Sequence, residues 1–258
     1  MELDPTAAAA GVRLVRLGVA QSTNAEALAR ARGGERGPLW IVAESQTGGR
    51  GRRGRTWVSR PGNLYATLLL SDPSPAAKVA QLSFVAALAV HDAIGELAPM
   101  LGPRLGLKWP NDVLCGGRKF CGILLEGEGA ADTIVALGIG VNCAHHPDDT
   151  AYPATDLAAA GAHVTPQALL LALSRSMLRR LAQWSRGEGF AAIRTDWLKR
   201  AEGLSRPIKA RLNDYEVTGV FETIDGEGHL VLMREDGSRE TIAAGDVFPL
   251  YRTRAEHA

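Results

Sequence analysis

The stretch Ser45-Gln46-Thr47-Gly48-Gly49-Arg50-Gly51-Arg52-Arg53-Gly54-Arg55 sets the pattern of the fold, because it separates two apolar segments, 39–44 and 64–70, that are typical of buried strands. Its glycines disfavour a helix or a central strand. The four arginines between positions 50 and 55 repel one another unless an anion lies among them. We therefore expect residues 45–62 to form a long, mobile, cationic loop that becomes ordered when an anionic ligand binds.

The glycines of this loop match the GxGxxG string of dinucleotide-binding folds over residues 49–54. In those folds a helix starts at the last glycine and holds the pyrophosphate at its N-terminus. Here Pro61 and Gly62 follow closely and would break such a helix, so we reject that fold. Glycine amides and arginine side chains can still bind phosphate. The alternatives are a solvated basic loop or an RNA contact.

The composition is that of a globular protein with a sizeable core. The 258 residues carry a net charge of +1 and are 46% hydrophobic, which disfavours disorder and a strongly basic nucleic-acid binder. The apolar segment 79–98 contains polar residues and is typical of a buried helix, so we expect no membrane span. Three cysteines without CxxC spacing favour a reduced, cytoplasmic compartment over disulfides or zinc.

Helices and strands are expected in mixed order before residue 204. We expect strands at 12–17, 39–44, 64–70, 104–108, 112–115, 119–126 and 133–141, with a hairpin turn at Gly116-Gly117. A helix over 25–31 follows the capping-box spacing of Thr23 to Glu26, and another runs from Ser74-Pro75 to Leu97. Two more helices are expected at 166–184 and 190–200. Residues 145–152 are expected to form a solvated loop, and no regular metal spacing supports a site there.

Five short β-rich runs follow Gly203, at 207–212, 215–224, 229–234, 239–243 and 246–251. This pattern is typical of a small barrel or sandwich. We therefore divide the chain into a flexible N-terminus (1–11), a catalytic domain (12–203) and a C-terminal β domain (204–258). The fold class is α/β, or α+β, with a mixed sheet.

The segment Lys108-Trp109-Pro110-Asn111-Asp112 has an unusual composition for a loop. Pro110 favours a turn that aims Asn111 and Asp112 in one direction. Read alone, Lys108 and Asp112 are better explained as an exposed ion pair of little value. If they belong to a nucleotide site, Asp112 is a candidate for holding a metal ion beside the phosphates.

Lys119 begins an apolar strand, and alternation would place it on one face with Cys121 and Ile123. A lysine on a buried face needs a carboxylate or a ligand anion as its partner, whereas an exposed lysine at the end of a strand needs none. A lysine and flexible arginines would suit the charge that develops in a nucleotidyl transfer. The three cysteines, Cys115, Cys121 and Cys143, are best explained as small buried hydrophobic residues.

Taken together, these motifs resemble biotin protein ligases, in the form that lacks an N-terminal DNA-binding domain. The resemblance spans residues 12–250 and rests on segments that occur in the family's order: Ser22-Thr23-Asn24, 44–55, 108–112, 117–124 and Gly138-Ile139-Gly140-Val141-Asn142. It implies a mixed sheet with helices on one side, followed by a small SH3-like barrel.

The resemblance also implies a two-step, ATP-dependent reaction. Biotin is activated as biotinyl-5′-AMP, with ATP, biotin and Mg²⁺ as substrates and cofactor. The biotinyl group then passes to a lysine of a biotin carboxyl carrier domain of a carboxylase. Because about eleven residues precede the first expected strand, we expect no binding to DNA. Family members often dimerise through sheet edges, and nothing in this sequence decides between a monomer and a homodimer.

The resemblance assigns roles to individual residues. Biotin contacts fall on Ser22, Thr23, Asn24, Gln46, Arg50, Gly51, Arg52 and Lys119. Contacts to ATP or the adenylate fall on Gly49, Arg53, Arg55, Trp57, Asn111 and Asn142. The catalytic candidates are Lys119, Arg52 and Asp112, and Asp112 is also the candidate ligand for Mg²⁺.

Several of these residues also suit purely structural roles, and the chain as a whole suits two alternative functions. Ser22 and Thr23 are suited to capping a helix, Trp57 to the core and Asn142 to a turn. A lipoate or octanoate ligase of the same fold is the alternative enzyme. The alternative of another class is a binding module that contacts RNA through the loop over residues 45–62, called the arginine loop below. This alternative predicts a salt-dependent RNA affinity.

Overall fold

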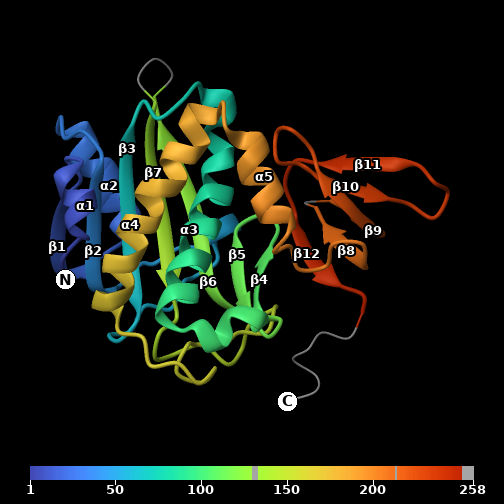
Figure 1. Ribbon diagram of the computed structural model, residues 1–258, viewed down its shortest axis with the longest axis horizontal. Coiled ribbons are helices and arrows are strands. Elements are labelled where there is room, and N and C mark those ends of the chain that lie inside the picture. The colour runs from blue at the N-terminus through green and yellow to red at the C-terminus, as the bar shows by residue number, and fades with distance from the viewer. Residues whose placement is uncertain (130–132, 213, 252–258) are drawn as a thin grey trace.

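The computed structural model describes residues 1–129, 133–212 and 214–251, which form two sheets joined by helices (Figure 1). The larger sheet has the order β1-β2-β3-β7-β6-β5-β4. Its strands are β1 Arg13–Ala20, β2 Leu39–Gln46, β3 Leu64–Ser71, β4 Leu105–Lys108, β5 Asp112–Cys115, β6 Arg118–Glu128 and β7 Ile134–Val141. Only β1 and β2 pair in parallel among these neighbours, so the sheet is mixed, as predicted.

Helices cover both faces of this sheet. The helices are α1 Pro5–Ala9, α2 Thr23–Arg32, α3 Leu82–Leu97, α4 Pro166–Trp184 and α5 Phe190–Leu198. On β2, Trp40 and Val42 belong to the large core that contains α3 and α4, whereas Leu39 and Ile41 pack against α2 in a separate cluster. The alternation of a strand explains this division, because successive side chains point to opposite faces. The expectation of helices on one side only is therefore wrong.

On the face of the sheet that carries α2, strands β6 and β7 have glycines at Gly122, Gly138 and Gly140, which leaves space above these two strands. The strand register places Tyr65, Gly140 and Gly122 in one row across β3, β7 and β6. Thr67 and Gly138 lie in the next row. Glycines remove side-chain volume from the two middle strands, so the sheet forms a floor on which other groups can lie close to the backbone.

The second sheet has the order β11-β10-β9-β8-β12 and is antiparallel. Its strands are β8 Pro207–Arg211, β9 Glu216–Ile224, β10 Leu230–Met233, β11 Arg239–Ile242 and β12 Asp246–Pro249, which match the five predicted runs. It packs against α5, where the Trp197 and Phe221 rings lie 6.4 Å apart. The indole of Trp109 also donates a hydrogen bond to the carbonyl of Gly228, at 2.9 Å. The boundary placed near Leu204 stays a prediction.

The structure corrects three local expectations. Residues 1–11 were expected to be flexible, but they include α1, whose cap residue Asp4 pairs with Arg175 at 2.8 Å. The cap of α2 is Ser22 rather than Thr23, so the capping-box spacing was misleading. The segment after Pro75 begins as a 3₁₀ turn over 76–81, and the α-helix starts at Leu82.

One helical stretch of the described chain, 76–97, has the length and apolar character of a membrane span. Most of it is buried inside the protein, and ten residues of α3 belong to the buried set. Core helices of globular proteins commonly have this character. The prediction of a buried helix at this position is confirmed.

Candidate active site

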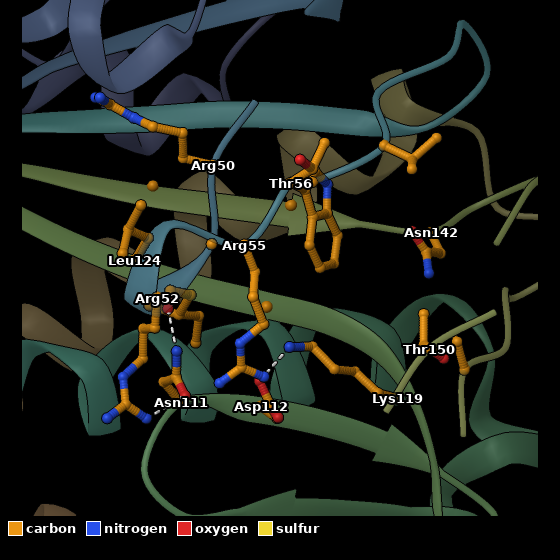
Figure 2. A pocket seen from close by; sticks show the side chains of 18 of the residues that line it. Arg50, Arg52, Arg55, Thr56, Asn111, Asp112, Lys119, Leu124, Asn142 and Thr150 are labelled. Carbon is orange, nitrogen blue, oxygen red and sulfur yellow. Dashed lines mark hydrogen bonds and ion pairs between the residues drawn. The ribbon is translucent and has the colours of Figure 1, made fainter. Parts of the chain in front are cut away.

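A cavity of about 390 Å³ lies over the glycine floor, beside the N-terminus of α2. The walls of the cavity are completed by the arginine loop, by the segment around 147–154 and by strand β12. Figure 2 shows Lys119 reaching toward Asp112, and Arg52 beside Asn111. The volume of the cavity suits a small organic ligand.

The N-terminus of α2 forms one end of the cavity. The hydroxyl of Ser22 accepts a bond from the backbone N–H of Ala25, at 3.5 Å. The side-chain oxygen of Gln46 accepts bonds from the backbone N–H and the hydroxyl of Thr23, at 2.8 and 3.2 Å. Gln46 then donates to Ser59 at 2.9 Å, which connects α2 to the arginine loop.

Asn24 is buried in a polar network at this end. Its amide nitrogen donates to Glu126 at 2.9 Å, and its oxygen accepts a bond from the hydroxyl of Thr67 at 2.6 Å. A methyl group on Gly138 would collide with the Asn24 side chain. Because a buried polar group without a partner is costly, this network fixes the orientation of Asn24.

Trp57 lies on the glycine floor. A methyl group at Gly140 would approach its Cε2 atom within 2.6 Å, and one at Gly122 would approach its Cζ3 atom within 2.9 Å. Its indole nitrogen is buried and has no hydrogen-bond acceptor among the described residues. A buried N–H without an acceptor is destabilising, so this atom is suited to donate to a ligand in the cavity.

Lys119, Asp112 and Lys108 form a charged cluster in which Asp112 and Lys108 are buried and Lys119 is half-buried. The Nζ atom of Lys119 lies 2.6 Å from Oδ1 of Asp112, and Nζ of Lys108 lies 3.1 Å from Oδ2. Burial raises the pKa of Asp112, but the Lys119 and Lys108 ammonium groups outweigh it and bring that pKa to about 2. The explanation of Lys108 and Asp112 as an exposed pair is wrong, because both side chains are 9% exposed.

A β-bulge determines which way Lys119 points. In the pairing of β5 with β6, Val113 faces Cys121 and Leu114 faces Lys119, so Phe120 is the extra residue. The bulge shifts the alternation by one position. Cys121 therefore belongs to the core, whereas Lys119 lies beside the floor residue Gly122. The prediction that Lys119 shares a face with Cys121 and Ile123 is wrong for this reason.

The arginine loop is held by carboxylates of the chain itself. Arg50 pairs with Glu126 at 3.1 Å, whereas Arg53 and Arg55 pair with Asp246 of β12. Only a 3₁₀ turn, Arg52–Gly54, interrupts the described loop, and no helix follows it before β3. The rejection of the dinucleotide-binding fold is confirmed. Carboxylates of the chain lie against three of these arginines, and the ordering of the loop by an anionic ligand stays a prediction.

Most predicted site residues meet in this cavity. It is lined by Ser22, Thr23, Asn24, Gln46, Arg50, Gly51, Arg52, Arg55, Trp57, Asn111, Asp112, Lys119 and Asn142. Gly49 and Arg53 belong to the same loop but do not line the cavity. Gly49 packs against the Trp57 carbonyl, because a methyl group there would approach that oxygen within 2.6 Å.

The sequence reasoning missed several residues that shape the site. Thr67 and Glu126 position Asn24, Tyr152 lines the cavity, and Asp246 holds the arginine loop. The ring of Tyr152 lies under the Lys108 ammonium, 4.5 Å from ring centre to nitrogen. The alternation of side chains along a strand would have placed Thr67 on the same sheet face as Tyr65. No sequence signal connected Asp246 to a loop almost 200 positions earlier.

A magnesium site at Asp112 does not fit the described arrangement. Both of its carboxylate oxygens face ammonium groups, and no group of three His, Cys, Asp or Glu residues in the described chain could hold a metal ion. In the loop predicted over 145–152, His146 pairs with Asp156 at 2.5 Å. All three cysteines are buried and free, as predicted.

Two family models match the chain, one over each sheet. Residues 20–142 match the Biotin/lipoate A/B protein ligase family, and residues 203–248 match the Biotin protein ligase C terminal domain. The chain is 46% identical over 235 residues to a biotin–[acetyl-CoA-carboxylase] ligase of Paracoccus denitrificans, covering 88% of this chain and 96% of that protein. The chain belongs to the biotin protein ligase family.

Solved structures of this family share the fold. A biotin protein ligase from Aquifex aeolicus in complex with biotin and ATP is 27% identical, with a TM-score of 0.76 over 92% of this chain and 97% of that one. A biotin protein ligase from Leishmania major in complex with biotinyl-5-AMP is 25% identical, with a TM-score of 0.63 over 90% and 99% of the two chains. The match to the C-terminal family model favours a biotin ligase over the lipoate or octanoate alternative.

Proposed function

We propose that this biotin protein ligase activates biotin as biotinyl-5′-AMP and transfers the biotinyl group to a lysine of a carboxylase carrier domain. The observation that carries the proposal is the charged cluster of Lys119, Asp112 and Lys108, which faces the arginine loop across one cavity. The cavity thus joins a polar end, at the N-terminus of α2, to a cationic end. Biotin fits the first, and a polyphosphate fits the second.

Biotin occupies the end formed by Ser22, Thr23, Asn24 and Gln46. These side chains offer hydroxyl and amide groups to a small polar head group, and the glycine floor admits flat ring systems close to the strands. Gln46 accepts a bond from the backbone N–H of Thr23, so part of its role is to position Thr23, whereas the side-chain oxygen of Asn24 accepts a bond from Thr67. The biotin carboxylate then lies toward Arg50, Gly51, Arg52 and Lys119.

In the first step an oxygen of the biotin carboxylate attacks the α-phosphorus of ATP. The bond to the bridging oxygen breaks, and pyrophosphate leaves. Lys119 and Arg52 stabilise the negative charge at the phosphorus, which is the main task in a reaction without a protein nucleophile. Asn111 accepts a bond from Arg52 at 3.4 Å and so aims its guanidinium.

The remaining nucleotide contacts fall on the arginine loop and on residues beside the glycine floor. Arg55, Trp57, Asn111 and Asn142 line the cavity and are assigned to ATP and the adenylate, whereas Gly49 and Arg53 act through the loop's conformation. The free indole N–H of Trp57 gains an acceptor when the adenylate binds. A mixed anhydride reacts readily with water, and a loop that covers it limits this loss.

In the second step the amine of the acceptor lysine attacks the carbonyl carbon of biotinyl-5′-AMP, and AMP leaves with the bridging oxygen. Both carboxylate oxygens of Asp112 face lysine ammonium groups, so we assign Asp112 no part in taking the proton of this amine, which passes to solvent. Its role is to hold Lys119 in place. Magnesium enters with ATP as part of the substrate, since Asp112 is engaged by two lysines.

The acceptor is proposed from a relative, and the compartment from the cysteines. We take the acceptor to be the carrier domain of an acetyl-CoA carboxylase, the substrate class in the name of the Paracoccus relative. Three free cysteines agree with action in a reducing cytoplasm.

Transfer to a carrier domain tests this function. The purified protein is incubated with ATP, Mg²⁺, biotin and a carrier domain, and the product is detected with streptavidin. The matched control is the carrier domain with its acceptor lysine replaced by arginine. We expect labelling that needs ATP and the lysine. Labelling of neither domain by a folded protein would contradict the proposal, and tight salt-dependent RNA binding would then favour the binding-module alternative.

A further inference from the structure

The strand that ends in Lys108 is the last strand of the large sheet in the described chain. β4 pairs with β5 on one side, where Lys108 lies opposite Asp112. Its other edge is held by the segment that leads to the C-terminal sheet. The backbone N–H of Leu107 donates to the carbonyl of Arg200, and the N–H of Glu202 donates to the carbonyl of Leu107, both at 2.8 Å. The place of Lys108 therefore depends on what lies against this edge.

Trp109 follows β4 directly and contacts the C-terminal sheet at two points. Its side chain is 2% exposed, and its indole N–H donates to the carbonyl of Gly228 at 2.9 Å. A methyl group on Gly245 would lie 3.7 Å from its Cζ3 atom. The ring thus lies between the turn that joins β9 to β10 and the residue before β12. Because an indole has a single donor, the bond to Gly228 fixes the orientation of the ring.

The turn between β9 and β10 is anchored on both sides of the Gly228 carbonyl. The carboxylate of Asp225 accepts bonds from the backbone N–H groups of Glu227 and His229, at 2.9 and 2.8 Å. Gly228 has a φ of +92°, and a methyl group on it would lie 2.7 Å from the Phe84 ring of α3. Glycine is therefore required by the conformation and by the close approach to α3. These contacts fix the place of the carbonyl that Trp109 meets.

The chain neighbours of Trp109 belong to the wall of the cavity. Lys108 and Asp112 line the cavity, whereas Trp109 does not. Residues 109–111 form the whole connection between β4 and β5, so a shift of the indole moves both ends of this connection. Asp112 in turn holds the ammonium of Lys119 at 2.6 Å. Electrostatic stabilisation of a transition state depends on charges that are held in place, so a displaced Asp112 makes Lys119 less effective.

We propose that Trp109 is a positioning residue for the adenylation step. Through its hydrogen bond to Gly228 it holds Lys108 and Asp112 in place, and through Asp112 it holds Lys119. This inference rests on the proposed adenylation of biotin. It gives the turn between β9 and β10 a part in the first step, although neither Trp109 nor Gly228 lines the cavity.

The test compares Trp109→Phe with Trp184→Phe. Trp184 is also 2% exposed and also donates its indole N–H at 2.9 Å, to the side-chain oxygen of Gln81, and neither residue lines the cavity. Each variant leaves a buried acceptor without its donor, so each should lower Tm by roughly 4–8 °C. Only Trp109→Phe should lower kcat of biotin-dependent pyrophosphate exchange about tenfold, with less than about a twofold change in KM for biotin. Equal kcat values for the two variants would overturn the inference.

A second pair of variants changes the turn and leaves Trp109 in place. Asp225→Ala removes the carboxylate that holds the turn between β9 and β10. The matched control is Asp236→Ala, because Asp236 accepts the backbone N–H of Ser238 at 2.9 Å in the turn between β10 and β11. We expect Asp225→Ala to lower kcat at least about threefold and Asp236→Ala to behave as wild type. If Trp109→Phe does not fold, equal kcat values for this pair would overturn the inference.

Lysine labelling without ligands gives a readout that does not depend on the activity. Reductive methylation followed by peptide mass spectrometry measures how accessible Lys108 is, and in the wild type this residue is only 7% exposed. Trp109→Phe should speed the labelling of Lys108 severalfold, whereas Trp184→Phe should leave it unchanged. Unchanged labelling of Lys108 in Trp109→Phe would overturn the inference. Absence of exchange in the wild type would refute the proposed function, whereas the labelling would still test the role of Trp109.

Discussion

Replacing Lys119 by methionine should separate catalysis from stability. The substitution removes the ammonium that lies 2.6 Å from Asp112 and keeps most of the side chain's volume. Loss of one electrostatic contact to a transition state typically costs about 10²–10³ in rate. We therefore expect biotin-dependent pyrophosphate exchange to slow by at least about a hundredfold in kcat.

The cost in stability should be small, because Asp112 keeps its second partner. Lys108 remains 3.1 Å away, so the cluster of two positive charges and one negative charge becomes a buried neutral pair. We expect a loss of roughly 1 kcal/mol in the free energy of unfolding, or about 2–4 °C in Tm for a chain of this size. By contrast, Asp112→Asn leaves the buried Lys108 ammonium without a counterion and should cost roughly 3–5 kcal/mol.

Exchange kinetics and thermal melting on the same preparations measure both quantities. The control is Lys78→Met, which removes a lysine that pairs with Glu188 at 2.7 Å outside the cavity. It should retain full exchange activity. If Lys119→Met kept more than a tenth of the wild-type kcat, or if it unfolded as readily as Asp112→Asn, the assignment of Lys119 would be refuted.

Three further perturbations follow from the geometry. Gly140→Ala should raise KM for biotin or ATP more than tenfold, because the new methyl group displaces Trp57 at 2.6 Å, whereas Gly95→Ala, with open space around it, should leave KM unchanged. Asn63→Ala should lower the free energy of unfolding by roughly 2–3 kcal/mol in denaturant titrations, since its buried oxygen accepts three successive backbone N–H groups. Burial lowers the pKa of His91 to about 4 against 6.5 in an unfolded chain, so the unfolded state binds more protons between these values. Stability should fall by up to ~3 kcal/mol as the pH drops from 6.5 to 4, and His91→Gln should flatten this part of the curve.

Local patterns in the sequence were sufficient to predict most of the strands. Alternation and turn residues located β8 to β12 within about two residues, and the turn at Gly116-Gly117 has positive φ at both glycines. The family resemblance assigned Lys119, Asp112 and the arginine loop to one site. The strands and turns depend on short-range chemistry, which a single sequence expresses directly.

Features that depend on partners far along the chain were not predictable in this way. The bulge at Phe120 turned Lys119 away from the face that simple alternation gave it, and only the pairing of β5 with β6 reveals it. The position of α2 on the second face depends on the parallel pairing of β1 with β2. Likewise, Asp246 meets the arginine loop only because the C-terminal sheet folds back beside it.

Pyrophosphate exchange into ATP, with biotin and with lipoate as separate acids, tests the central claim most directly. The cavity joins a polar end to a cluster of lysines and arginines, and the chain belongs to the biotin protein ligase family, so we predict exchange that requires biotin and does not respond to lipoate. The measurement needs only a folded protein, Mg²⁺, ATP and labelled pyrophosphate. Exchange with lipoate but not with biotin, or with neither acid, would contradict the claim that this site adenylates biotin.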